Sequence, residues 1–149
     1  MVLELASLVV VGLAGTVLWV LNPEAAAIFY GAELEWSPPV VGLVLGASQA
    51  LSYGVIFGFG EVLVRRWSWL ARKVESTRAR YASHLERNYL LMSFSGAVTG
   101  LPPIIALTIL AGGFGVPLRH FLPVCAAGRV IRFTVLAAVG SGLLEWWRG

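Results

Sequence analysis

Charge is scarce in this sequence, and one acidic residue type is missing altogether. Only 13% of the 149 residues are charged, and the chain contains no aspartate. Soluble domains carry about a quarter of charged residues. The missing aspartate excludes a Ser–His–Asp triad of the usual form and argues against a metal held by several carboxylates. We therefore expect no enzymatic activity, no cofactor and no metal site.

Cysteine is almost as rare. Cys125 is the only one, so an intrachain disulfide and a cysteine-ligated metal site are both excluded. We expect Cys125 to act as a small apolar packing residue.

Apolar residues dominate instead, at 58% of the chain with a mean hydropathy of +0.80. Such a composition predicts an all-α integral membrane protein with a single membrane domain over residues 1–149. We predict three spanning helices, two re-entrant helical hairpins in an inverted-repeat arrangement and a cytoplasmic amphipathic helix. The predicted segments are an N-terminal spanning helix (1–21), a first hairpin plus helix (22–64), a basic amphipathic segment (65–88) and a second hairpin plus helix (89–147).

The first predicted hairpin follows Asn22 and Pro23. Residues 22–39 hold three glutamates, and their apolar middle, residues 25–31, is too short to cross a bilayer. Non-helical backbone at membrane depth is tolerated where protein or water surrounds it, which favours a re-entrant hairpin. The alternative is a loop that rests on the membrane interface.

The second predicted hairpin contains two breaks. Pro102 and Pro103 remove two backbone donors, so a continuous helix should end there. Gly112 and Gly113 lie in a glycine-rich stretch that offers a tight turn. The alternative is one kinked spanning helix.

Seven of the eleven basic residues fall between residues 65 and 87. A juxtamembrane basic segment normally stays in the cytoplasm, so the N-terminus is predicted to be cytoplasmic as well. Apolar residues recur there at three- or four-residue steps, which predicts an amphipathic helix on anionic lipid rather than a nucleic-acid site. The alternative is a connector packed on the protein itself. The predicted membrane-surface residues are Arg65, Arg66, Arg72 and Lys73.

Two arginines, Arg129 and Arg132, interrupt the apolar run of residues 121–147. A charge near mid-membrane costs about 2.5–3.5 kcal/mol on insertion scales, so these residues require a partner, a wet cavity or the interface. They share a helix face and could bind a lipid phosphate, or they could snorkel to headgroups. Glu24 is a candidate counter-charge, or else a wet interfacial residue. Gln49 adds a polar group near the middle of residues 40–64.

The two halves correspond at an offset of about 81 residues, with Gly31 matching Gly112 and Ala47 matching Gly128. The first half starts on one side of the membrane and the second on the other. Inverted repeats with broken segments build the midplane sites of many carriers.

In this order of motifs the chain resembles the DedA/VTT superfamily (SNARE-associated Golgi proteins), closest to its small YqaA-like bacterial branch. Asn22-Pro23-Glu24, GASQALSYGVIFGFGE and LPPIIALTILAGGFGVPLRHFLPVCAAGRVIR carry the resemblance, which covers residues 22–140. It implies two re-entrant hairpins that meet from opposite faces, transport across the bilayer (lipid scrambling, recycling of undecaprenyl phosphate or proton-coupled transport), and an acidic hairpin residue at Glu24. Larger bacterial members place an arginine after the proline of the second hairpin. Here that neighbourhood is uncharged, so either Arg129 and Arg132 supply the charge or the substrate differs.

Three functions fit these features. The first is a lipid translocator or scramblase-like carrier of phospholipid or polyprenyl phosphate. The second is a proton- or ion-coupled transporter of a small solute, with Glu24 as the titrating group. The third is a non-transporting scaffold that binds partner helices, and the three Gly-x-x-x-Gly pairs are also compatible with a homo-oligomer.

Overall fold

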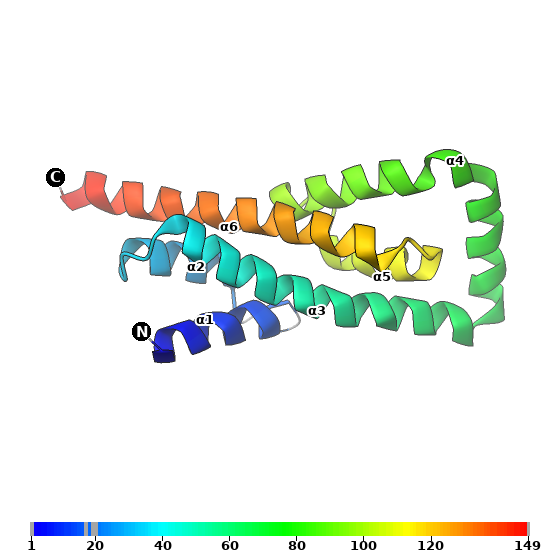
Figure 1. Cartoon of the computed structure of the whole chain (residues 1–149), viewed down its shortest axis with the longest axis horizontal. Helices are drawn as coiled ribbons and strands as arrows, with labels where there is room; N and C mark the ends of the chain where they lie inside the picture. Colours follow the sequence, from blue (N-terminus) through cyan, green and yellow to red (C-terminus); the bar gives the residue numbers. More distant parts are fainter. Residues whose placement is uncertain (1, 17, 19–20, 149) are drawn as a thin grey trace. The chain divides into compact units, whose positions relative to one another are not determined.

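The computed structural model describes residues 2–16, 18 and 21–148, without the side chains of residues 70, 73–74, 77–86 and 148. The described part is helical, as predicted, and is shown in Figure 1. Its helices are α1 (Val2–Ala14), α2 (Pro23–Ala32), α3 (Pro38–Arg66), α4 (Ser68–Thr99), α5 (Ile104–Phe114) and α6 (Leu118–Arg148).

Two of these helices, α3 and α6, are long and apolar enough to cross a membrane. They contain 29 and 31 residues, against the 20 or so that a bilayer requires. The predicted third spanning helix over residues 1–21 is wrong in extent, because α1 ends at Ala14. Its 13 residues cover about 20 Å of a hydrocarbon core about 30 Å thick.

The early end of α1 has a packing reason at Gly15. A side chain on Gly15 would overlap the Leu21 carbonyl and the Pro23 ring, so only glycine lets the chain pass this closely. The chain then enters α2, and Tyr30 near its far end donates a hydrogen bond of 2.9 Å to the Glu4 carbonyl. Helices α1 and α2 therefore form an antiparallel hairpin. The segment predicted to be a hairpin by itself, residues 22–39, instead supplies one arm.

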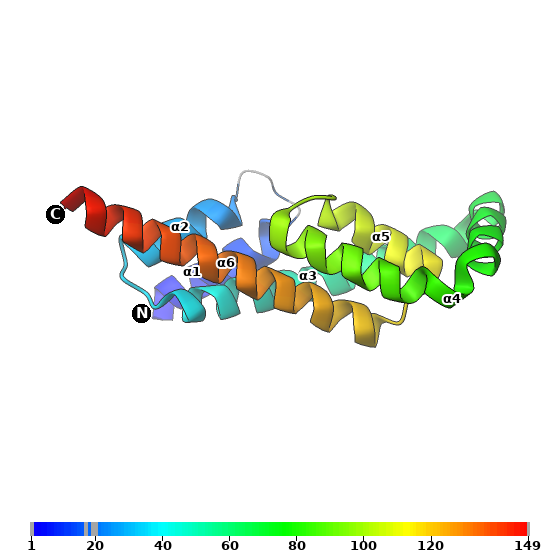
Figure 2. The same cartoon turned by 90° about the horizontal axis from the view of Figure 1, so that it is seen from above.

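A second antiparallel hairpin joins α4 to α5, and its tight connection is visible in Figure 2. The Pro102–Pro103 break is confirmed, since α4 ends at Thr99 and α5 begins at Ile104. Tyr89 in α4 donates to the Leu107 carbonyl in α5. The basic segment and the first arm of this hairpin form one continuous helix, so the predicted boundary between residues 88 and 89 is not a helix end. The α4 ribbon instead changes direction within the helix (Figure 1).

Gly112 and Gly113 do not break the chain, contrary to the prediction. Both are helical, and α5 runs on to Phe114 before Gly115 ends it with a φ of 68°. Gly112 serves a different purpose, because a side chain there would overlap the backbone of Phe57. The glycine allows two helices to approach closely, and Gly115 supplies the left-handed turn.

The chain divides into two compact units. The first contains residues 1–52 and 126–149, with a core formed by Leu8, Ala27, Tyr30, Val41, Leu45, Phe133 and Ala137. The second contains residues 53–125, with a core that includes Tyr53, Phe57, Tyr89, Leu107, Ala111 and Phe121. Each unit contains one hairpin and a part of each long helix.

Close glycine contacts follow the same pattern in the two units. In the first, Gly31 of α2 packs on the Ala137 backbone, and Gly140 of α6 packs on Ile28. In the second, Gly112 of α5 packs on the Phe57 backbone, and Gly60 of α3 packs on Ile109. Residues 28 and 31 therefore correspond to 109 and 112, while 137 and 140 correspond to 57 and 60.

Candidate functional site: an ion cluster between α2 and α6

The candidate site lies within the first unit and begins with the capped start of α2. Asn22 adopts an extended conformation, and its side-chain oxygen accepts hydrogen bonds from the backbone of Glu24 and Ala25. Pro23 occupies the first helical turn, where its missing N–H costs nothing. The local sequence thus fixes Glu24 in the first turn, where the helix dipole favours a negative charge.

Helix α6 brings both arginines to this carboxylate. Arg132 Nη2 lies 3.3 Å from Glu24 Oε1, and Arg129 Nη1 lies 3.8 Å from the same oxygen. Both guanidinium groups thus approach one oxygen from successive turns of α6. The sequence analysis named Glu24 as a candidate counter-charge, and the structure places it against both arginines across more than a hundred positions.

The cluster is largely shielded from solvent by protein. The Arg129 side chain is 9% exposed, Arg132 is 23% exposed and Glu24 is 36% exposed. Arg129 also lies over the Phe133 ring, with 5.8 Å between Cζ and the ring centroid. An aromatic face attracts a guanidinium, so Phe133 contributes to holding the more buried arginine.

The position of the arginines along α6 bears on the snorkelling alternative. Arg132 follows the first residue of the helix by fourteen positions, which is about 21 Å by helical rise, and it precedes the last by sixteen. It is therefore near the middle of a helix long enough to span a bilayer. An extended arginine side chain is too short to cover that distance, so Glu24 is the compensating group that the geometry provides.

The cluster carries an excess of positive charge. Two guanidinium groups face one carboxylate, which leaves a formal charge of +1 on the three side chains. Guanidinium donors match the geometry of phosphate and carboxylate oxygens. The arrangement can therefore receive an anionic group in place of, or beside, Glu24.

Gln49 lies on the side of α3 that faces α6. It is 4% exposed, and it follows Gly42 and Gly46 at helical spacing. A side chain on Gly46 would overlap Val130, and one on Gly42 would overlap Thr134. Gln49 is thus buried on the α3 face that carries the Gly42 and Gly46 contacts with α6.

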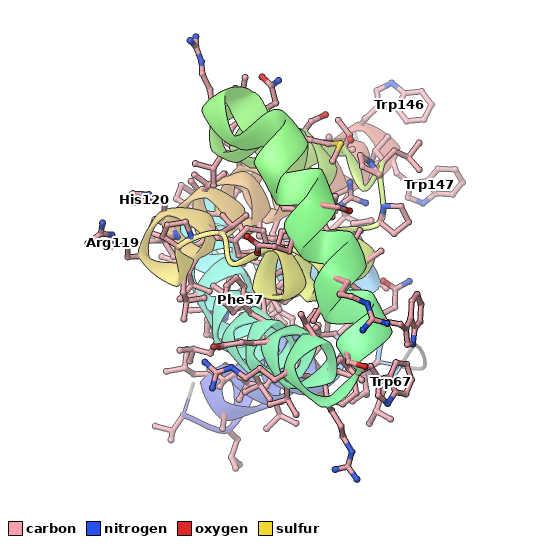
Figure 3. The ribbon with its side chains drawn as sticks, turned by 90° about the vertical axis from the view of Figure 1, so that its right-hand side faces the viewer. Phe57, Trp67, Arg119, His120, Trp146 and Trp147 are labelled. Atoms are coloured by element: carbon pink, nitrogen blue, oxygen red, sulfur yellow. The ribbon has the colours of Figure 1, made fainter. Side chains whose placement is uncertain are left out.

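The predicted membrane-surface residues are solvent-exposed wherever they are described. Arg65 pairs with Glu61 at 2.5 Å, and Arg66, Trp67 and Arg72 are exposed. The Lys73 side chain lies outside the described residues. Figure 3 shows Trp67, Arg119 and His120 projecting away from the ribbon. Among the described residues, no group of three His, Cys, Asp or Glu side chains is placed to hold a metal.

One member of the site escaped sequence reasoning. Phe133 follows Arg129 by four residues, the spacing that places two side chains on one helix face. That signal was present, but apolar residues at such spacing are common in a membrane helix. Glu35 and Trp36 lie in the loop between α2 and α3, and Glu145 lies near the end of α6, so no local sequence pattern joins these three residues.

Comparison with family models, curated proteins and solved structures finds no match for this chain.

Proposed function

We propose that this chain is an integral membrane protein that moves lipid between leaflets, as a translocator or scramblase-like carrier of the DedA/VTT type. The fold supports this because it pairs two span-length helices with two hairpins whose second arms, α2 and α5, have only 10 and 11 residues. Helices that short cover about 15 Å and enter a bilayer without crossing it. We therefore assign both hairpins as re-entrant.

The single observation that carries the proposal is the Glu24–Arg129–Arg132 cluster. A charge in the middle of an apolar helix has a high free-energy cost in a membrane, so such residues usually pair with another group and mark a functional site. Its net positive charge suits the phosphate of a phospholipid or a polyprenyl phosphate, while acyl chains remain in the surrounding lipid. Glu24 keeps the arginines compensated when no headgroup is bound.

An inverted repeat fits the matched glycine contacts. In each unit, the second arm of a hairpin packs on one long helix through two glycines, at positions related by 81 residues in the hairpin and 80 in the long helix. Glycine stands at both contact positions in each unit, Gly31 and Gly140 in the first and Gly112 and Gly60 in the second, which supports the correspondence proposed from the sequence. Inverted repeats are a common architecture of carriers whose binding site is alternately accessible from the two sides of the membrane.

Charge at the helix ends supports an orientation. Arg65 and Arg66 end α3, and Arg119 and His120 begin α6, whereas Glu33, Glu35 and Glu145 lie beyond α2 and near the end of α6. Basic ends remain cytoplasmic, so we place Arg65, Arg66 and Arg119 inside. Because α1 and α2 are antiparallel, the same orientation puts the N-terminus outside with Glu33, and not in the cytoplasm as the sequence predicted. The plasma membrane of a bacterium is the proposed location, with the start of α4 on anionic lipid.

The test is a flipping assay in liposomes of purified protein. We expect the wild-type chain to accelerate transfer of a labelled phospholipid or polyprenyl phosphate between leaflets. Arg132→Ala should slow it about tenfold, the effect of losing one charge-assisted contact to phosphate. Arg65→Ala, which removes an exposed arginine, is the matched control and should leave the rate unchanged. No acceleration by the wild-type protein would remove the proposal.

A proton-coupled solute transporter is the second candidate, favoured by the position of one carboxylate between two guanidinium groups. It predicts that an imposed pH gradient drives uptake of a solute, and that Glu24→Gln abolishes this dependence. Lipid flipping that continues without any pH gradient would favour the first candidate instead.

A further inference from the structure

A cavity of about 420 Å³ lies within the first unit, at the ends of three helices. It is lined by the last residues of α2, by the loop that leads to α3, and by the last two turns of α6. Its lining is Gly31, Ala32, Glu35, Trp36, Ser37, Pro38, Ser141, Leu144 and Glu145. Ser141 lies nine residues beyond Arg132, about 13 Å along α6, so the cavity is separate from the ion cluster.

The electrostatics of the cavity favour a cation. Glu35 and Glu145 both line it, and none of the described side chains in its wall is basic. Helix α2 ends there, and a helix C-terminus carries a partial negative charge. Three negative contributions, from Glu35, Glu145 and the end of α2, thus converge on one small space.

The third helix end does not offset them. The N-terminus of α3 would normally present free N–H groups to an anion. Here its first two residues are Pro38 and Pro39, which have no N–H. The next two amides, of Val40 and Val41, already donate to the Ser37 carbonyl at 2.9 and 3.2 Å. The start of α3 therefore offers little to a negative ligand.

Trp36 is held in place as part of the cavity wall. Its backbone N–H donates to the Tyr30 carbonyl at 3.1 Å, and its ring meets the Tyr30 ring edge-on, with centroids 5.5 Å apart. Tyr30 is itself fixed by its bond to the Glu4 carbonyl. A tryptophan fixed in this way offers an aromatic surface without further loss of side-chain entropy on binding, and tryptophan is the best partner for an organic cation.

We infer that this cavity binds an organic ammonium group, with Glu35 and Glu145 supplying charge and Trp36 supplying an aromatic surface. A divalent metal fits less well, because no third acidic or histidine ligand joins the two carboxylates among the described residues. The ammonium can come from the headgroup of an amine-bearing phospholipid or from a soluble amine. The inference goes beyond lipid transport and does not depend on it.

The test measures binding to the full chain in detergent, with two probes. Ethylammonium chloride is titrated by calorimetry, and phosphatidylethanolamine is titrated by native mass spectrometry beside phosphatidylglycerol, which has no amine. We expect Glu35→Gln, Glu145→Gln and Trp36→Leu each to weaken amine binding, by about tenfold for either carboxylate. Glu33→Gln removes a nearby glutamate outside the cavity and should have no effect.

The outcomes separate the sources. Binding of both amines identifies the ammonium group itself as the ligand, whereas binding of phosphatidylethanolamine alone identifies the lipid headgroup. Equal binding of the two lipids, or equal losses in Glu33→Gln and Glu35→Gln, would overturn the inference. Since binding is measured without transport, a protein that binds the amine but flips no lipid would refute only the proposed function.

Discussion

At the scale of single residues, the value of an ion pair depends on what surrounds it. Glu24 and Arg132 are separated by 3.3 Å and are both partly shielded, whereas Glu61 and Arg65 are closer, at 2.5 Å, but 48% and 78% exposed. Water screens the exposed pair and competes for its donors. The longer pair should therefore be the stronger one, contrary to a ranking by distance.

A double-mutant cycle tests this ranking. We expect Glu24→Gln and Arg132→Gln to be coupled by about 1 kcal/mol or more, because either change alone leaves a shielded charge poorly compensated. Glu61→Gln and Arg65→Gln should be coupled by no more than about 0.5 kcal/mol. Thermal unfolding in detergent measures both cycles. Equal coupling in the two pairs would mean that water screens Glu24 as fully as Glu61.

The residues of this cluster could be found from sequence because a charge within an apolar run is conspicuous and expensive. Arg129 and Arg132 met that criterion, whereas Glu24 was a candidate because of its place at the start of the first predicted hairpin. Their contact could not be deduced from composition, since it depends on how α2 packs on α6. Trp36 and Glu145 gave no comparable signal, because an aromatic or an acid near the end of a membrane helix is ordinary.

At the scale of helices, proline predicted the helix ends better than glycine did. Pro102 and Pro103 ended a helix as predicted, since proline removes a donor whatever its surroundings. Gly112 and Gly113 did not, because glycine only permits a turn and can equally permit close helix contact. The end of α1 at Ala14 was missed for the same reason. Gly15 reads as one more small residue in an apolar run until its neighbours are known.

Glycine substitutions should divide into two classes accordingly. Gly31→Ala and Gly112→Ala place a methyl group against neighbouring backbone, which cannot yield as a side chain can, so each should destabilise the fold by about 1–3 kcal/mol. Gly54→Ala and Gly58→Ala meet no described atom within 4 Å and should be neutral or stabilising by up to about 1 kcal/mol.

Thermal unfolding midpoints of the four variants provide the comparison, with Gly54→Ala as the matched control for the same substitution in a helix. A loss of stability in Gly54→Ala as large as that in Gly112→Ala would mean that intrinsic helix preference, rather than close contact, governs these positions. A loss in Gly54→Ala seen only at high protein concentration would instead reveal a second copy on that face.

At the scale of the whole molecule, the directions of the helices determine which ends share a side of the membrane. Gly42 meets Thr134 and Gly46 meets Val130, so α3 and α6 are antiparallel. If both span, the start of α3 and the end of α6 emerge on one side. If the α4–α5 hairpin is re-entrant, as we propose, it returns the chain to the side it left and puts Arg119 on the same side as the start of α4.

Cysteine labelling in intact cells tests this topology. The natural Cys125 is buried and can be replaced with alanine, leaving single cysteines at exposed positions. We expect an impermeant maleimide to label Glu33→Cys and Glu145→Cys from outside, and to reach Arg72→Cys and Arg119→Cys only after the cells are opened. Basic flanks hold the latter two positions in the cytoplasm. Labelling of Arg119→Cys from outside would mean that α4 and α5 cross the membrane as one kinked span. In that case the chain would lack its second re-entrant hairpin, and the inverted repeat would lose one of its halves.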